Sequence, residues 1–372
     1  MTINGYATPE GTLKYRERFA GRANQTHFRK ASGLFLSSIG IGTYLGKPND
    51  ETDRRYTEAV TRAVELGANV IDSAANYRCQ RSERAIGAAL HDLFTAEKVS
   101  REELLICTKG GYLAFDGQAP RDVRAYVDER FVKPGIADFS DFVGGSHCMT
   151  PAYLRDQLEQ SLSNLGLDCI DVYYIHNPES QLGAVPRDLF DSRLAAAFEQ
   201  LEASRRIGKI RYYGVATWNG FRADPESSVY HSIERMIEIA TAAGGEDHGF
   251  RFIQLPFNLA MTEALLKRNQ KVKDEFISLI EAASAFGISL IASASTLQGR
   301  VSAGLSDDVR ELLGALSTDA QTAIQFVRST PGITTALVGM SRVEHVEENL
   351  KLRELPDVAA TDYARVISGL TT

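Results

Sequence analysis

Apolar and polar positions alternate in two ways between about residues 37 and 338. Short runs rich in β-branched residues, typical of buried parallel strands, are separated by longer segments whose apolar residues recur at helical spacing. This order predicts parallel strands joined by crossover helices. The strands are expected at residues 38–42, 69–73, 104–108, 170–176, 210–215, 252–257, 289–293 and 334–338. The pattern suits an open doubly wound sheet nearly as well as a closed barrel.

Three of the intervening segments carry clear helix signals. Thr150-Pro151 provides a cap and a first-turn proline, apolar residues follow at helical spacing, and Gly166 ends the predicted helix. A second apolar stripe spans residues 56–67 and a third spans residues 272–287, each ending near a glycine. We expect each of these helices to turn its apolar stripe towards the strands.

Length and composition favour one globular unit. The chain has 372 residues, and α/β barrels of this length fold as single domains. An apolar content of 44% and a charged content of 24% are those of a globular protein with a large core. The net charge of −7 disfavours binding to nucleic acid or to an anionic membrane, since both require a basic face. We therefore expect one domain over residues 1–372.

The cysteines and the hydropathy pattern bear on the compartment. The four cysteines are widely spaced and form no CxxC pair, which disfavours a zinc ribbon or a dithiol redox motif. The first thirty residues contain no apolar run like that of a signal peptide. No later stretch reaches the length of a membrane span. A cytoplasmic location with reduced thiols is therefore expected.

Two predicted connections that follow strands are unusually long, residues 110–149 and residues 177–188. In a barrel, such connections lie at the carboxyl ends of the strands, where active sites form. The first connection is rich in aromatic residues. Two interpretations are open, because these aromatic side chains could wall a substrate pocket or could pack on one another as a lid.

Chemically informative residues stand at the ends of three successive predicted strands. Asp72 ends the second strand and Tyr77 follows five residues later. Lys109 follows the third strand, and His176 ends the fourth. This order of residues, in these sequence contexts, resembles the aldo-keto reductase family. The similarity covers about residues 27–350.

The resemblance implies a fold that the periodicity alone leaves open. Members of the family are expected to form a (β/α)8 TIM barrel with an N-terminal hairpin and long βα loops. Ser32-Gly33-Leu34 is similar to the opening hairpin of the family. The barrel core is then expected over about residues 27–350.

These four residues suit the reduction of a carbonyl, which needs a hydride donor at carbon and a proton donor at the developing oxyanion. Tyr77 is the expected acid. A free phenol has a pKa of about 10, so the Lys109 ammonium is expected to stabilise the phenolate and bring proton donation nearer to neutral pH. Asp72 is expected to orient and neutralise Lys109. His176 is expected to hydrogen-bond the carbonyl oxygen.

The resemblance further implies a nicotinamide cofactor extended across the barrel mouth. Residues 338–349 resemble the family segment that binds the adenosine phosphate, and a helix starting near Arg342 would favour its charge. NADP(H) is expected, and NAD(H) stays open because His345 stands where many relatives have Gln or Arg. Gln254 matches the usual partner of the nicotinamide carboxamide. The expected cofactor contacts are Gly42, Thr43, Asp72, Thr217, Gln254, Ser293, Gly339, Ser341, Arg342, His345, Glu348 and Asn349.

Two positions depart from the family pattern beside the expected nicotinamide. Ala216-Thr217 stands where many relatives have Ser-Asn or Ser-Arg, so Thr217 would have to replace a carboxamide partner. Ser293 and the residues after it stand where relatives place an aromatic ring that stacks on the nicotinamide. Trp218 could supply that ring from the neighbouring loop, line the substrate pocket or simply pack.

Three function classes follow from these residues. The favoured one is reduction of an aldehyde, a ketone or a sugar-like carbonyl, or the reverse oxidation of an alcohol, on a small molecule. The atypical nicotinamide pocket leaves open a cofactor-binding regulatory or scaffolding subunit with vestigial reductase activity. A metal-dependent lyase or hydrolase is disfavoured, and no metal is expected, because the other histidines form no helical ligand pair with a carboxylate. No oligomeric state is predicted.

Overall fold

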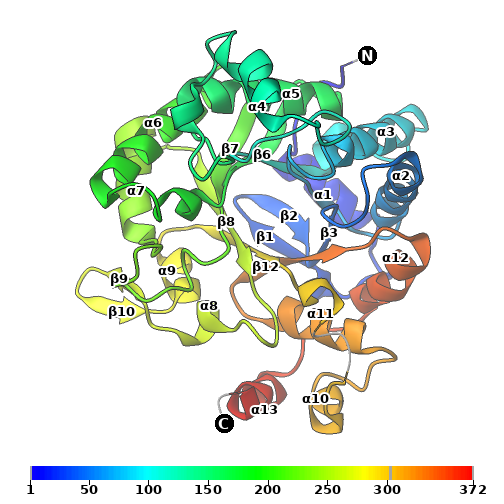
Figure 1. The fold of residues 1–372 in the computed structure, drawn as a ribbon. Coiled ribbons are helices and arrows are strands. Elements are labelled where there is room, and N and C mark those ends of the chain that lie inside the picture. Colours follow the sequence, from blue (N-terminus) through cyan, green and yellow to red (C-terminus); the bar gives the residue numbers. More distant parts are fainter. Residues whose placement is uncertain (1, 301–303, 371–372) are drawn as a thin grey trace.

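Eight parallel strands form a closed barrel in the computed structural model, which describes residues 2–300 and 304–370 (Figure 1). The closed barrel implied by the resemblance is therefore confirmed, and each predicted strand end lies within two residues of the observed one. Neighbouring strands follow one another in sequence, and β12 pairs with β3 to complete the circle. The barrel strands are β3 (Ile39–Gly42), β4 (Val70–Asp72), β5 (Leu105–Gly110), β6 (Ile170–His176), β7 (Ile210–Ala216), β8 (Phe250–Pro256), β11 (Ser289–Ser293) and β12 (Ile333–Gly339).

An N-terminal hairpin covers the end of the barrel where the strands begin. Strands β1 (Phe28–Ala31) and β2 (Leu34–Ser37) are joined by Ser32 and Gly33, whose φ angles of 49° and 82° are both positive. A two-residue turn of this kind matches the twist of the strands it joins. Leu34 and Leu36 of β2 are buried against the apolar interior of the barrel. The hairpin predicted by resemblance thus closes one end and leaves the other open.

Helices surround the barrel, as Figure 1 shows. The helix predicted after Thr150 is confirmed, since it begins at Pro151 and ends at Gly166, which takes the left-handed conformation of a cap. In the part of the chain that the structure describes, no helix is both long and apolar enough to cross a membrane. The α-helices are α1 (Pro9–Glu17), α2 (Asp50–Glu65), α3 (Arg81–Thr95), α4 (Val123–Val127), α5 (Pro151–Leu165), α6 (Arg187–Arg206), α7 (Ile233–Gly244), α8 (Glu263–Leu266), α9 (Leu279–Ala285), α10 (Asp307–Leu312), α11 (Asp319–Ser329), α12 (Val343–Asn349) and α13 (Ala360–Leu370). Shorter helical turns are η1 (Gln25–His27), η2 (Arg101–Glu103), the π-helical η3 (Asp128–Val132), η4 (Phe139–Asp141), η5 (Pro178–Gln181), η6 (Leu297–Gly299) and η7 (Leu350–Glu354).

The helix predicted over residues 272–287 is wrong in its first half. Strands β9 (Gln270–Val272) and β10 (Glu275–Ile277) form a small antiparallel hairpin there, and only α9 is helical. Val272 and Phe276 are four residues apart, a spacing that fits a helix, but both are residue types that favour strands. Ser278 and Glu281 form a capping box, which fixes the start of the helix after the hairpin.

The long connection after β5 packs mainly on itself. Its aromatic residues Phe131 and Phe142 are buried together with Tyr153 of α5 in a small cluster of their own. Among its described residues, Tyr112 is the one that lines the cavity at the barrel mouth. Of the two interpretations, self-packing therefore applies to the body of the loop, and the pocket interpretation applies to Tyr112.

Candidate active site

A cavity of about 790 Å³ opens at the carboxyl ends of the barrel strands. Its walls come from strand ends on several sides of the barrel and from the loops that follow them. Tyr77 and His176 line one part of it, while Ser341 and Asn349 belong to the segment after β12. A cavity lined by both apolar and polar side chains is typical of a small-molecule site.

The strand register explains why three of the four predicted catalytic side chains meet. Alternate residues of a strand face the same side, so the positions two residues after Val70, Cys107 and Tyr174 continue the barrel interior. Those positions hold Asp72, Lys109 and His176. The interior is apolar up to the last layer, where it becomes charged and polar. This placement agrees with what the sequence motif implied.

Lys109 and Asp72 form a buried ion pair beneath the cavity. Lys109 is 1% exposed, and its Nζ lies 2.6 Å from Asp72 Oδ2 and 2.6 Å from the carbonyl oxygen of Ser73. Gln254 donates from Nε2 to the other carboxylate oxygen of Asp72, at 2.8 Å. Burial by itself lowers the pKa of Lys109, but Asp72 and Tyr77 outweigh burial and hold the pKa above its ordinary value. Lys109 is therefore a cation at neutral pH.

Tyr77 lies over this cation at the wall of the cavity. The Lys109 Nζ is 4.9 Å from the centroid of the Tyr77 ring. Burial raises the pKa of Tyr77, and although the charge of Lys109 lowers it, the pKa stays above the usual value for tyrosine. The sequence predicted a pKa nearer to neutrality because it showed the lysine but not the burial. The phenol is therefore protonated at neutral pH and able to donate its proton.

His176 faces Tyr77 across the same end of the cavity. The two rings are 5.7 Å apart in an edge-to-face arrangement. Burial, with the charges of Lys109 and His147, places the pKa of His176 well below its ordinary value, so the imidazole is neutral at neutral pH. Within the described residues, its buried Nδ1 has no hydrogen-bond partner. A neutral imidazole has one N–H with which to orient a carbonyl oxygen.

Two residues that the sequence analysis missed hold these groups in place. His147 is buried and its Nε2 lies 2.7 Å from the carbonyl oxygen of His176. Arg78, next to Tyr77, has a positive φ of 47° and pairs with Asp53 while stacking on Tyr56 at 4.7 Å. No motif pointed to either residue, because His147 binds a backbone oxygen and Arg78 pairs with a carboxylate that is distant in sequence. A basic residue directly after Tyr77 is the one signal that the sequence offered.

The predicted phosphate end is more open than the Tyr77 end. Gly339, Ser341, His345, Glu348 and Asn349 line the cavity. Arg342 is exposed at the N-cap of α12 and is not among the lining residues. Thr318 donates to Glu348 Oε1 at 2.8 Å.

Unpaired polar atoms along the cavity fit a bound dinucleotide. Asn349 is 6% exposed, and its Oδ1 has no hydrogen-bond partner among residues 2–300 and 304–370. Asn76 Oδ1 and His176 Nδ1 are also buried atoms without a hydrogen-bond partner among these residues. All three residues line the cavity. Buried polar atoms without partners are costly unless a ligand or water pairs with them. The residues present therefore suit a long polar ligand.

The nicotinamide contacts predicted from the sequence reach the cavity wall. Gly42, Thr43, Thr217, Gln254 and Ser293 all line the cavity. The amide of Gln254 is engaged with Asp72. The aromatic ring expected near Ser293 is absent from the sequence there, and Trp218, which is 40% exposed, lines the cavity from the neighbouring loop.

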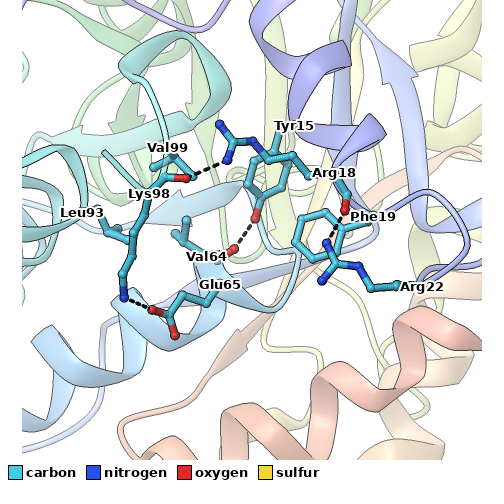
Figure 2. A pocket seen from close by; sticks show the side chains of 9 residues that line it. All are labelled: Tyr15, Arg18, Phe19, Arg22, Val64, Glu65, Leu93, Lys98 and Val99. Atoms are coloured by element: carbon cyan, nitrogen blue, oxygen red, sulfur yellow. Dashed lines mark hydrogen bonds and ion pairs between the residues drawn. The ribbon is translucent and has the colours of Figure 1, made fainter. Parts of the chain in front are cut away.

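A second hollow, of about 440 Å³, lies near the ends of α2 and α3, at the opposite rim of the barrel. Figure 2 shows the side chains that line it. Its charged side chains already have partners. Lys98 pairs with Glu65, Arg18 donates to the carbonyl oxygen of Lys98 at 2.8 Å, and Arg22 donates to that of Arg18. The floor is aromatic and aliphatic, with Tyr15 bonded to the backbone of α2. The cavity at the barrel mouth is therefore the candidate active site.

Comparison with known proteins gives a consistent result. A family model described as "Aldo/keto reductase family" matches residues 38–368. The "Putative voltage-gated potassium channel subunit beta" of Schizosaccharomyces pombe is 23% identical over 95% of this chain and 92% of that protein. Aldo-keto reductase family 1 member C2 of Homo sapiens is 29% identical, but the match spans only 50% of this chain and 49% of that protein. D-threo-aldose 1-dehydrogenase of a Pseudomonas species is 28% identical over 50% of this chain and 52% of that protein.

Solved structures share the fold at low sequence identity. The aldo/keto reductase from Klebsiella pneumoniae, in complex with NADP and acetate, superposes with a TM-score of 0.64 at 19% identity and covers 93% of this chain and 96% of its own. An aldo-keto reductase from Bacillus halodurans in its holo form gives a TM-score of 0.61 at 19% identity, with 92% and 94% covered. At this identity the likeness concerns the fold alone.

Proposed function

Because this chain belongs to the aldo/keto reductase family, we propose that it reduces an aldehyde, a ketone or a sugar-like carbonyl with NADPH, or catalyses the reverse oxidation of an alcohol. The observation that carries the proposal is the meeting of Tyr77, His176 and the Lys109–Asp72 pair at one end of the cavity. Several titratable groups with shifted pKa values at one cavity favour a catalytic site.

Each of these residues has a distinct part in the proposed reaction. A reduced nicotinamide, when bound, supplies the electron pair and hydrogen that the carbonyl carbon accepts. Tyr77 gives its phenolic proton to the carbonyl oxygen as negative charge develops there. Lys109 stabilises the phenolate that remains, and Asp72 holds Lys109 in place. His176 donates an N–H to the same oxygen and fixes its direction.

The cofactor contacts expected from the sequence are part of the proposal. Thr217, Gln254 and Ser293 would hold the nicotinamide end, with Gly42 and Thr43 beside it. Gly339, Ser341, His345, Glu348 and Asn349 would hold the adenosine end. Arg342 would meet the phosphate that distinguishes NADPH from NADH, since its exposed guanidinium is free to turn towards a dianion.

We further propose the domain organisation, the compartment and the class of ligand. Residues 1–372 would act as one domain in the cytoplasm, on small molecules and not on nucleic acid or membranes.

The test is the consumption of NADPH by the purified chain with a broad panel of aldehydes, ketones and aldoses. The proposal predicts turnover with at least one carbonyl and a severe loss in Tyr77→Phe. Turnover that is equally fast in Tyr77→Phe would contradict the assignment of the acid.

One observation favours a second function, a cofactor-binding regulatory or scaffolding subunit. The relative named as a potassium channel subunit beta aligns with almost the whole chain, whereas the two reductase and dehydrogenase relatives align with half of it. A stable complex with a partner protein, altered by the redox state of the nicotinamide and unaffected by Tyr77→Phe, would favour this function. Efficient turnover by a monomer would exclude it.

A further inference from the structure

Glu179 is a buried carboxylate that the proposed reaction does not use. It lies in η5, three residues after His176, and is 6% exposed. Its Oε1 accepts hydrogen bonds from the backbone N–H groups of Trp218 at 2.6 Å, Asn219 at 2.9 Å and Gly220 at 3.4 Å. Successive N–H groups that converge on one oxygen form an anion-binding nest. A side chain from one catalytic loop therefore holds the backbone of the next loop.

The other carboxylate oxygen of Glu179 faces the far end of the same loop. His231 Nε2 lies 3.6 Å from Glu179 Oε2, and the His231 ring stacks on Phe190 with centroids 5.5 Å apart. The backbone N–H of His231 donates to the carbonyl oxygen of Gly220 at 2.8 Å. A Cβ at Gly220 would stand 2.1 Å from the His231 ring, so only glycine allows this approach. Both ends of the loop over residues 217–232 thus gather around Glu179.

The surroundings of Glu179 stabilise its charged form. Burial raises the pKa of this carboxyl, but the imidazole of His231 and the N–H groups of Asn219 and Trp218 outweigh burial and leave the pKa below its ordinary value. The carboxylate is therefore ionised at neutral pH, which is the form that binds N–H donors most strongly.

The loop held in this way carries Trp218 to the cavity. The strand register pairs His176 with Ala216, so the two residues after Ala216 leave the barrel directly beside the end of β6. Trp218 lines the cavity from there, near Asn177 and His176, which line it too. No aromatic side chain reaches the cavity from the segment Ser293 to Thr296, because the sequence has none there. Trp218 is a large flat apolar surface on this side of the mouth, where Tyr112 also lines the cavity.

We propose that Glu179 is a positioning residue, which fixes the loop after β7 so that the Trp218 indole forms a wall for the carbonyl substrate beside His176. An indole face packs against an apolar or planar part of a ligand and excludes water from the reacting oxygen. The substrate would then be a carbonyl compound with a flat or apolar face next to the reacting group. The part of this inference that concerns turnover rests on the proposed function, and the part that concerns the position of Trp218 does not.

The experiment uses the fact that Trp218 is the one tryptophan of the chain, so fluorescence excited selectively at tryptophan reports on this site alone. Glu179→Gln keeps the size of the side chain and one acceptor oxygen but removes the charge, and Glu179→Leu removes both acceptors. Glu202→Gln is the matched control, since Glu202 is also buried and accepts a backbone N–H, from Gly249 at 2.6 Å, but Gly249, unlike Trp218, does not line the cavity. All three variants are expected to melt earlier than the parent.

The inference predicts that only the Glu179 variants change the emission maximum and anisotropy of Trp218, with Leu having the larger effect. The KM for a carbonyl substrate should rise roughly ten-fold in Glu179→Gln, while the KM for NADPH stays constant. Trp218→Ala should raise the carbonyl KM similarly, and adding Glu179→Gln to it should change the KM no further. Unchanged fluorescence in both folded Glu179 variants, or KM effects that add in the double variant, would overturn the inference. If the parent turns over no carbonyl, the proposed function fails and the fluorescence still decides the role of Glu179.

Discussion

Two buried ion pairs stand at opposite ends of the same barrel. Asp171 and Arg101 lie 2.7 Å apart where the strands begin, and Asp72 and Lys109 lie 2.6 Å apart where they end. Asp171 also accepts backbone N–H groups from Ala7 at 2.6 Å and from Ile106 at 2.7 Å, so its carboxylate is enclosed by the protein.

The second pair differs in what lies beside it. Asp72 lines the cavity, and the cation of Lys109 lies against the ring of Tyr77. A buried pair that the protein surrounds suits a structural role, whereas a pair that borders a cavity suits the proposed chemistry. The residue types alone do not separate the two cases. We call the end of the barrel with Asp171 and Arg101 the structural rim, and the end with Asp72 and Lys109 the reactive rim.

The largest effect is expected at the reactive rim. Tyr77→Phe should lower kcat about a thousand-fold, or about 4 kcal/mol in activation free energy, because the proton donor is lost. Tyr15→Phe is the matched control, since the hydroxyl of Tyr15 donates a hydrogen bond to the carbonyl oxygen of Val64 at 2.5 Å, away from the cavity. It should lower stability and leave kcat unchanged. Steady-state rates with the most active carbonyl provide the measurement, and similar kcat losses in both variants would contradict the contrast.

At the structural rim, Asp171→Asn should lower the free energy of unfolding by about 3 kcal/mol, because it leaves the Arg101 guanidinium buried without its counter-charge. The kcat per folded molecule should stay the same. Urea denaturation checks the first statement, and rates normalised to folded protein check the second. A variant of unaltered stability but reduced kcat would place Asp171 in the chemistry.

Acidification should weaken the structural rim through His27. Burial lowers the pKa of His27 to about 3, whereas a histidine in an unfolded chain has a pKa of about 6.5. Between these values the unfolded chain binds more protons than the folded protein does. The free energy of unfolding therefore falls as the pH drops below about 6.5, by about 1.4 kcal/mol per pH unit. Loss of about 2 kcal/mol between pH 6.5 and 5 is expected from this group.

His27→Gln removes this contribution and provides the comparison. Its free energy of unfolding should depend less steeply on pH between 5 and 6.5 than that of the parent, as measured by denaturant titrations at each pH. Parallel slopes for the two proteins would show that His27 titrates normally in the folded state.

The smallest effect is expected at the adenosine end of the reactive rim. Arg342→Ala should raise the KM for NADPH roughly ten-fold, about 1.4 kcal/mol, through the loss of a charged hydrogen bond to the phosphate. The KM for NADH should not change. Equal increases for both cofactors would remove Arg342 from the choice between them.

The sequence predicted most of the barrel and the main residues that meet at the candidate active site. The strands could be located because each is a short apolar run, and Asp72, Lys109 and His176 could be grouped because each stands at a strand end. Closure of the barrel came from the resemblance, since periodicity does not record which strands pair. The helix predicted from residue 272 was wrong because a spacing of four residues fits a strand–turn–strand segment as well.

Other features depend on contacts that no local pattern records. Glu179 and His147 act on backbone groups, which have no characteristic side chain, and Asp53, the partner of Arg78, lies far away in sequence. The pKa of Tyr77 was predicted in the wrong direction because burial is a property of the folded chain. Sequence thus identifies candidate reactive groups more readily than the groups that hold them in place.

Calorimetric titration of the purified chain with NADPH and with NADH shows whether the cavity at the reactive rim binds a nicotinamide dinucleotide. We predict that NADPH binds one molecule per chain in the absence of any carbonyl, and more tightly than NADH. Binding of neither cofactor would contradict this prediction.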